Sequence, residues 1–201
     1  MSPTLERIRI LRATLAAESA EQKSHHTIAE VFVLLQPVEL GLGGIVFSVP
    51  FLQPVPLPGL STPFGILLAT LGFIHVSGQG FRALPKRLLE RRLEAATVSK
   101  ILEYTEKTLM GLAKIPYWNW GRAGRYLAHP RALGSHIIFM AVLLSLPLPI
   151  PFSNAVPAWG IVFASLALIE SNGIFIMLSY LTLLGNVVFF GGVVLLASGA
   201  M

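Results

Sequence analysis

Cysteine and aspartate are both absent from the sequence, and each absence removes a class of function. Without cysteine the chain has no disulfide, no thiolate metal ligand and no cysteine nucleophile. Without aspartate it has no Ser-His-Asp triad, and it contains no Walker A, dinucleotide-binding or HExxH pattern either. His25, His26, His129 and His136 lack the spacing to other ligands that a metal site needs. We therefore expect no enzymatic activity, no bound metal and no cofactor.

Charge is scarce as well. Charged residues make up 12% of the chain, whereas soluble domains carry about a quarter, and 54% of the residues are hydrophobic. Between Ala132 and Met201 the only charged side chain is Glu170, and no soluble surface can be built from such a segment. The net charge of +5 fits the basic residues that flank membrane segments. We expect membrane lipids as partners and no nucleic acid, because little soluble surface remains for a phosphate footprint.

Hydrophobic runs divide the chain into five segments. The run from Ile174 to Ser198 would be roughly 37 Å long as a helix, which is enough to cross a bilayer with tilt. The beginning of the chain lacks the apolar core and cleavage site of a signal peptide. The predicted segments are amphipathic helices (1–40), a first apolar hairpin (41–80), a basic connector (81–131), a second apolar hairpin (132–173) and a transmembrane helix (174–201).

Both apolar blocks are interrupted by prolines at alternate positions, which cannot remain α-helical. An offset of 95 residues places Pro54 on Pro149 and Gly65 on Gly160, and it predicts an internal duplication. The sequence thus predicts an all-α integral membrane protein with two related repeats of broken half-helices, interfacial amphipathic helices and a C-terminal transmembrane helix. The residues predicted to break the helices are Pro54, Pro56, Pro58, Pro63, Pro147, Pro149, Pro151 and Pro157.

The breaks expose backbone carbonyls, which the membrane tolerates only inside protein or beside a watery cavity. The half-helices after them are about 21 to 22 Å long, so they either re-enter or lie where the bilayer thins. Polar residues near the breaks and helix ends form the predicted ligand site: Ser61, Thr62, Ser153, Asn154, His75 and Glu170. Several of these residues also have simpler interpretations. The polar residues at the breaks could cap the helices that follow them. His75 and Glu170, which the repeat aligns with each other, could form a proton relay or could simply lie where the chain leaves the membrane.

The connector between the blocks is strongly basic. Its eleven Lys and Arg residues against four Glu give a net charge of +7, which predicts a cytoplasmic location. Residues 86–114 have the pattern of an amphipathic helix lying on headgroups, with an i,i+4 pair of Glu103 and Lys107. Its predicted apolar stripe consists of Leu89, Leu93, Ala96, Ile101, Leu109 and Leu112. The aromatic residues from Tyr117 to Trp120 fit an interfacial belt better than a sugar platform. Contacts with lipid or a partner are assigned to Arg87, Arg91, Arg92, Trp118 and Trp120.

Four stretches carry a family resemblance that covers roughly residues 28 to 198: Pro54–Gly65, Gly78 with the basic Leu84–Leu88, Leu148–Asn154 with Pro157-Ala158, and Ile169–Gly173. Together they resemble the ExoD family of bacterial membrane proteins, named for a role in exopolysaccharide synthesis. That family usually has glycine where this chain has Ser153, an Arg-Asp pair where it has Ser171-Asn172, and glutamine where it has Ile74. Without the Arg-Asp charges Glu170 stands alone, which weakens any charge-coupled role for it.

The resemblance implies a multi-pass protein of the cytoplasmic membrane that takes part in producing or handling extracellular polysaccharide. It provides no catalytic residue. We expect the paired broken helices to form a polar site for transport or permeation. The alternative is a structural or regulatory subunit that does not transport and that binds lipid or a polysaccharide-synthesis enzyme through its basic connector. A homo-oligomer is compatible with both.

Overall fold

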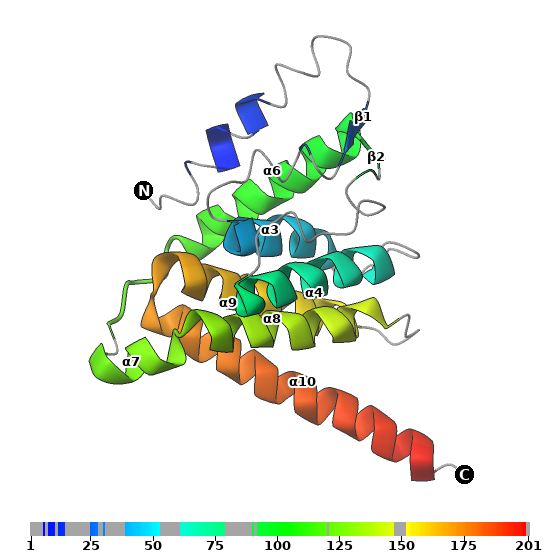
Figure 1. Cartoon of the computed structure of the whole chain (residues 1–201), viewed down its shortest axis with the longest axis vertical. Helices are drawn as coiled ribbons and strands as arrows, with labels where there is room; N and C mark the ends of the chain where they lie inside the picture. The colour runs from blue at the N-terminus through cyan, green and yellow to red at the C-terminus, as the bar shows by residue number, and fades with distance from the viewer. Residues whose placement is uncertain are drawn as a thin grey trace.

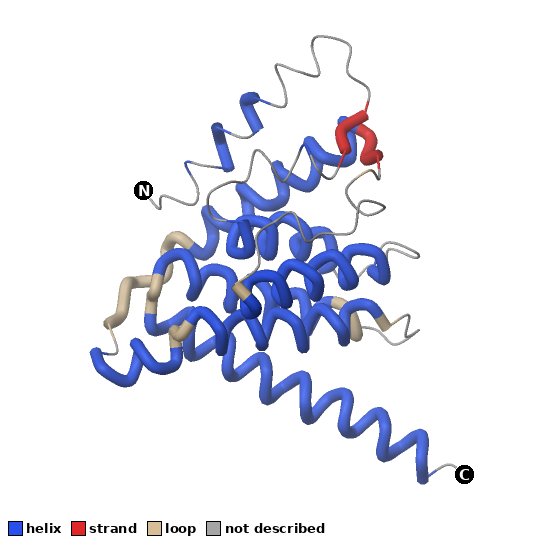
Figure 2. The backbone as a smooth tube through the Cα atoms, in the orientation of Figure 1, coloured by secondary structure: helices blue, strands red, loops and turns tan. Residues whose placement is uncertain are grey.

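The fold is mainly helical, as Figures 1 and 2 show. The computed structural model describes residues 6, 8–10, 12–14, 25–27, 30, 39–52, 61–78, 90, 92–119, 121–146 and 152–199. The helices are α3 (Glu39–Ser48), the 3-10 turn η1 (Val49–Phe51), α4 (Ser61–Ser77), α6 (Ala95–Leu112), α7 (Gly121–Leu127), α8 (Pro130–Ser145), α9 (Ala155–Glu170) and α10 (Gly173–Gly199). The all-α prediction holds for these elements. Within the described residues, strand structure is limited to an antiparallel pairing of β1 (His25–Thr27) with β2 (Arg92–Glu94).

Local sequence signals account for the helix ends. At the start of α8, His129 Nδ1 accepts a hydrogen bond from Arg131 N at 3.2 Å, and Pro130 takes the first helical position. The helix stops at Leu146, which is extended (φ −73°, ψ 121°), because the residue before a proline is disfavoured in the α conformation. Helix α9 stops at Ser171, whose left-handed backbone (φ 50°) cannot continue it.

The described helices of each apolar block end before the prolines and resume after them. In the first block η1 ends at Phe51 and α4 begins at Ser61; in the second, α8 ends at Ser145 and α9 begins at Ala155. Pro63 and Pro157 lie in the first turns of α4 and α9, where a proline costs no hydrogen bond. The other predicted breakers lie outside the described residues: Pro54, Pro56, Pro58, Pro147, Pro149 and Pro151.

The four shorter apolar helices pack in antiparallel pairs through close glycine contacts. Helix α4 lies on α8, and a Cβ atom at Gly65 would lie 2.6 Å from Ala141 O. Further along the same pair, a Cβ atom at Gly72 would lie 2.7 Å from the Ile138 side chain. Helix α3 lies on α9 in the same manner, and α8 also packs on α9. The end of α4 and the start of α8 lie near the turn between α9 and α10, at what we call the connector end, whereas η1, the start of α4, the end of α8 and the start of α9 lie at the opposite end of the bundle (Figure 1).

Helix α6 lies over α3 and η1, on the other side of the bundle from α10 (Figure 1). The predicted amphipathic character is present, but the apolar stripe packs on the protein rather than being left for lipid. The expected stripe included Ala96, which is exposed. The buried face consists of Val98, Ile101, Leu102, Thr105 and Leu109.

Helix α10 is the longest element and projects beyond the bundle at its C-terminal end (Figure 1). Its 27 residues make a helix of about 40 Å. Among the described helices it alone has, from Gly173 to Leu196, the length and apolar composition to cross a membrane. Many of its large apolar side chains are exposed, including Leu181, Leu184, Val188 and Leu195. The predicted C-terminal transmembrane helix is thus present as an element, beginning one residue earlier than expected.

Candidate functional site

The predicted site residues at the first break join the two hairpins. Ser61 is buried at the start of α4, and the next residue, Thr62, donates a hydrogen bond from Oγ1 to Ser145 O at 3.0 Å. This bond links the first turn of α4 to the last turn of α8. It also satisfies a carbonyl that the end of α8 leaves without a helical partner.

At the second break the structure leaves a buried acceptor unpaired. Ser153 is 3% exposed, and Asn154 precedes the first residue of α9 without making a side-chain capping bond. The capping interpretation is therefore wrong for Asn154. Its Oδ1 atom is buried and finds no hydrogen-bond partner among the described residues. An unsatisfied buried oxygen costs free energy, so it is a ready acceptor for a donor from a ligand or ion shell.

Further polar groups missed by the sequence reasoning continue into the bundle from this end. Ser48 and Ser165 are both fully buried between α3 and α9. Ser48 Oγ donates to Gly44 O, whereas Ser165 Oγ faces Gly44 and has no hydrogen-bond partner among the described residues. The signal that could have identified Ser165 is that it is the single hydroxyl in a helix that is otherwise apolar up to Glu170 at its end.

His75 and Glu170 lie at the other end of the bundle. Thr62 and His75 are thirteen residues apart on α4, or about 20 Å along the helix. Asn154 and Glu170 are separated by the whole of α9, about 24 Å. The six predicted ligand residues therefore form two groups rather than one site, with an exposed His75 and a half-buried Glu170 near the connector.

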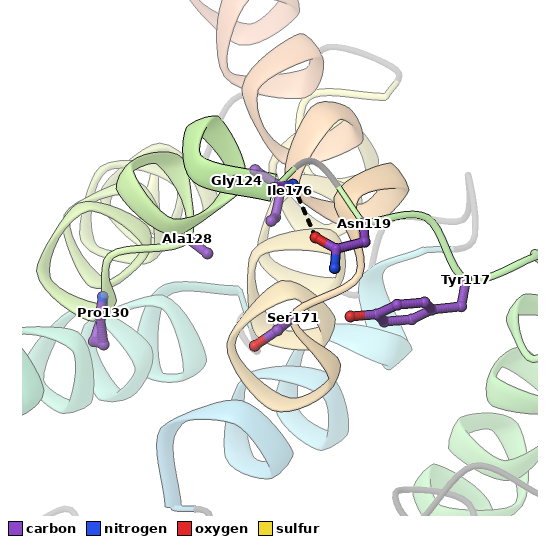
Figure 3. Close-up of a pocket in the computed structure, with 8 residues that line it drawn as sticks. Tyr117, Asn119, Gly124, Ala128, Pro130, Ser171 and Ile176 are labelled. Atoms are coloured by element: carbon purple, nitrogen blue, oxygen red, sulfur yellow. Dashed lines mark hydrogen bonds between the residues drawn. The ribbon is translucent and has the colours of Figure 1, made fainter.

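The connector end contains a cavity of about 590 Å³, shown in Figure 3. It lies between the loop before α7, α7 itself, the start of α8 and the turn that joins α9 to α10. Gly124 and Pro130 contribute to its wall. The remaining lining residues are Tyr117, Asn119, Gly121, Ala128, Ser171 and Ile176.

One buried asparagine holds this cavity together. Asn172 Oδ1 accepts hydrogen bonds from Trp118 N at 3.1 Å and from Ile174 N at 3.0 Å. Its Nδ2 atom donates to Pro116 O at 3.2 Å, and Gly173 N donates to Trp118 O at 2.7 Å. These bonds attach the connector loop to the beginning of α10. The sequence marks Asn172 only as a departure from the Arg-Asp pair of the family.

Two further contacts support the wall of the cavity. Asn119 Oδ1 accepts from Gly121 N at 2.8 Å, and the left-handed backbone of Gly121 (φ 58°) forms the tight turn into α7. The Tyr180 hydroxyl of α10 donates to Leu127 O at 3.2 Å, which attaches the end of α7 to α10. Hydrogen bonds therefore hold both the loop before α7 and the end of α7 beside the cavity.

Two acidic side chains of the connector, those of Glu103 and Glu106, form ion pairs. Arg9 Nε and Arg12 Nη1 bind the two oxygens of Glu106 at 2.8 and 2.7 Å. The hydrogen bond from Arg9, followed by that from Arg12, holds the pKa of Glu106 below its ordinary value. The predicted pair of Glu103 and Lys107 is confirmed at 2.7 Å.

Of the predicted lipid or partner contacts, two can be placed. Arg92 is exposed in β2, and Trp118 is exposed beside the cavity, as an interfacial aromatic residue would be. Arg87, Arg91 and Trp120 lie outside the described residues. In the part of the chain that the structure describes, no group of three His or Glu side chains could hold a metal ion.

Comparison with known proteins gives a consistent result. The family model described as "Exopolysaccharide synthesis, ExoD" matches residues 9–192. The chain is 30% identical over 170 residues to Protein ExoD of Rhizobium meliloti, an alignment that covers 76% of this chain and 66% of the relative, just under two thirds. It is 26% identical over 157 residues to the uncharacterized protein slr1875 of Synechocystis sp., covering 73% and 68% of the two chains. No solved structure matches it. The match along nearly the whole sequence establishes that the chain belongs to the ExoD family, which is related to exopolysaccharide synthesis.

Proposed function

We propose that this protein supports exopolysaccharide synthesis from within the cytoplasmic membrane by transport or permeation at paired helical hairpins. The hairpins are α3 with α4 and α8 with α9. In this proposal they are related repeats that enter from the connector side and turn back at their proline breaks. The polar groups at the breaks form the path of the transported solute.

The observation that carries the proposal is the register of the two antiparallel helix pairs. In α3 and α9, a Cβ atom at Gly41 would lie 2.5 Å from the Ile169 side chain. The 95-residue offset between the predicted repeats aligns Gly41 with residue 136 of α8 and Ile169 with residue 74 of α4. The repeat therefore requires residues 136 and 74 to face each other as Gly41 and Ile169 do. Residues 136 and 74 lie between two close contacts of α8 with α4, the contact of Gly134 with Val76 and the contact of Gly72 with Ile138. A duplication in which the first helix of each repeat packs on the second helix of the other would give this relation. It would also put both breaks at one end of the bundle.

Helix length and buried polarity give further support. Helices α4 and α9 have 17 and 16 residues, or about 24 to 25 Å, and are shorter than a hydrocarbon core of about 30 Å. A hairpin of this depth ends inside the membrane or where the bilayer thins. Backbone groups at such a turn need shelter or water. The spare acceptors of Asn154, at the break, and Ser165, about 16 Å farther along α9, lie on the same side of this helix and would serve a hydrated solute along it.

A flux assay tests this function. Purified protein is placed in vesicles loaded in turn with small cations, anions and sugars. We expect flux of at least one solute above that of protein-free vesicles, and a several-fold loss in Asn154→Ala. The matched control is Ser135→Ala, because the Ser135 hydroxyl is exposed and binds only its own helix at Arg131 O. If no solute crosses faster than in empty vesicles, the transport proposal is rejected.

A second candidate function is favoured by one observation about α6. Its outer face exposes Lys100 and Lys107 along a flank of the bundle, and charged side chains beside hydrocarbon are costly. A partner protein covering this flank would suit a structural or regulatory subunit. Under this alternative, Arg92→Glu combined with Lys100→Glu should abolish crosslinking to a polysaccharide-synthesis enzyme in native membranes. Under the transport proposal the same variant should retain full flux.

A further inference from the structure

The cavity at the connector end lies beside the beginning of the membrane-crossing helix. Ile176, one of its lining residues, is in the first turn of α10, and Ser171 precedes that helix by two residues. The exposed aromatic side chains of Tyr117 and Trp118 lie in the loop beside it, and such residues concentrate at the membrane surface. The cavity is therefore placed at the depth of lipid headgroups, at the end of the bundle opposite the proline breaks.

The lining of the cavity is neutral, with both polar and apolar parts. Tyr117 presents an exposed ring, and the bond from Gly121 N to Asn119 Oδ1 orients the amide of Asn119. In Figure 3 the amide nitrogen of Asn119 and the hydroxyl of Tyr117 point toward the same space. Ala128 and Ile176 add an apolar surface. A sugar ring matches this combination, because its C–H face packs on an aromatic ring while its hydroxyls bind amides and hydroxyls.

Size and surroundings indicate how such a sugar is presented. The volume of about 590 Å³ lies within the range of small-molecule sites, about 300–1,000 Å³. Lys114 and Arg131 are exposed within three residues of lining positions along the chain and can neutralise a phosphate. Below the cavity, α10 exposes Met177, Leu181 and Leu184 at helical spacing, an apolar surface for a lipid chain.

We propose that this cavity binds the headgroup of a lipid-linked sugar phosphate, with the sugar inside the cavity, the phosphate near Lys114 and Arg131, and the lipid chain along α10. This inference does not rest on the transport proposal, since the two sites are at opposite ends of the bundle. A polysaccharide precursor held on a lipid is consistent with the family to which the chain belongs. The protein would then hold such a precursor at the membrane surface without transforming it.

Binding measurements on the full chain in nanodiscs test the proposal. The probe is a radiolabelled polyprenyl-phosphate-linked hexose. The comparison ligands are the free hexose phosphate and polyprenyl phosphate without sugar. We expect saturable binding of the first, and at least ~10-fold weaker binding of both others, a factor equal to about 1.4 kcal/mol. Equal binding of the free hexose phosphate overturns the lipid assignment, and equal binding of polyprenyl phosphate overturns the sugar assignment.

Variants at the two tyrosines separate recognition from folding. Tyr117→Leu removes the ring and the hydroxyl from the cavity and should weaken binding ~10-fold, as expected for loss of an aromatic contact. Tyr126→Leu is the matched control, because Tyr126 is 82% exposed on α7 and does not line the cavity. Both side chains are exposed, so both variants should retain the thermal unfolding of the wild type. An equal affinity in the two variants contradicts the proposal.

Thiol protection gives a second, independent measurement. The chain has no cysteine, so Ser171→Cys introduces a single thiol at the cavity. Saturation with the lipid-linked sugar should slow maleimide labelling of this thiol several-fold. Labelling of Ser198→Cys, at the far end of α10, should be unchanged. Equal labelling of Ser171→Cys with and without the probe places the ligand elsewhere and overturns the proposal.

Discussion

Gly65 lies where α4 meets α8, and its missing side chain sets how closely the two helices approach. An added Cβ atom would lie 2.6 Å from Ala141 O and 2.8 Å from Ser145 N. Both atoms belong to the backbone, so no side-chain rotation can relieve the clash. We expect Gly65→Ala to lower the free energy of unfolding by about 1–3 kcal/mol. Thermal or denaturant unfolding in detergent measures the change.

A glycine with free space provides the control for this prediction. At Gly185 in α10, no atom lies within 4 Å of an added Cβ. Alanine favours a helix over glycine by up to about 1 kcal/mol, so Gly185→Ala should leave stability unchanged or raise it. If the two variants unfold alike, the close approach of α4 and α8 is not a determinant of stability.

Asn172 is the second residue with a large expected effect, because three hydrogen bonds depend on its side chain. Asn172→Ala removes the partners of Trp118 N, Ile174 N and Pro116 O at a position only 3% exposed. Leaving buried groups unpaired should cost about 1–3 kcal/mol and expose the connector loop to proteases. Limited proteolysis and thermal unfolding measure both effects.

The conservative variant at this position separates acceptor from donor. Asn172→Asp keeps the oxygen that binds Trp118 N and Ile174 N, but it replaces the donor to Pro116 O with a second oxygen. Its stability should therefore lie between those of the wild type and Asn172→Ala. A larger loss with aspartate than with alanine would show that charge, rather than hydrogen bonding, dominates at this turn.

At the scale of elements, the N-terminal segment is attached to α6 by a carboxylate with two guanidinium partners. Glu106 is 13% exposed at its side chain and binds Arg9 and Arg12, and the neighbouring Ile8 is fully buried. Glu106→Gln should weaken this attachment by roughly 1–2 kcal/mol and increase amide exchange at residues 8–10. Glu103→Gln is the control, because its pair with Lys107 lies within α6 and is exposed. Equal exchange in the two variants would contradict the assignment.

The same attachment should depend on pH. Arg9 and then Arg12 lower the pKa of Glu106 from its ordinary value of 4.5, so the ionised carboxylate is favoured in the attached state. Its contribution is therefore complete above pH 4.5 and is lost as the pH falls through the lowered pKa. The protection of the amides at residues 8–10, taken relative to their intrinsic exchange rate at each pH, should fall below pH 4.5 in the wild type and stay constant in Glu106→Gln. Protection that falls toward alkaline pH instead would contradict this prediction.

Several elements were predictable from sequence because their signals are local. Prolines marked the ends of the apolar helices, and the single uninterrupted run marked α10. The pairing of β1 with β2 was not predictable, since two three-residue segments 65 residues apart carry no alternating pattern. The buried face of α6 was placed only in part, because packing on α3 selected Val98 and Leu102 over Ala96.

At the scale of the whole molecule, the position of the two ends of α10 gives a topology prediction. Gly173 N donates to Trp118 O, so the start of α10 lies with the connector, whose positive charge predicts a cytoplasmic location. If α10 crosses the membrane, its C-terminal end lies outside. We expect Ser198→Cys to react with a membrane-impermeant maleimide on intact cells, and Lys114→Cys to react only after permeabilisation.

A third cysteine position tests the hairpins separately. Gly78 is exposed at the end of α4, near the start of α8. Because the first hairpin returns to the connector end, Gly78→Cys should behave like Lys114→Cys. Labelling of Gly78→Cys from outside would mean that the hairpin does not return. Labelling of positions 114 and 198 from one side would mean that α10 does not cross.

The sequence by itself predicted the membrane character and determined the helical class and the places where the chain leaves its helices. These follow from composition, hydrophobic periodicity and proline, which act locally and need no knowledge of neighbours, whereas the family follows from its motifs and from the family model that matches residues 9–192. Only the tertiary structure decided that Thr62 binds Ser145 O, that Ser165 lies against Gly44, and that Asn172 joins the connector loop to the start of α10 beside a cavity. The physical reason is that hydrogen bonds between helices depend on how the glycine contacts align them, and no local pattern specifies that alignment.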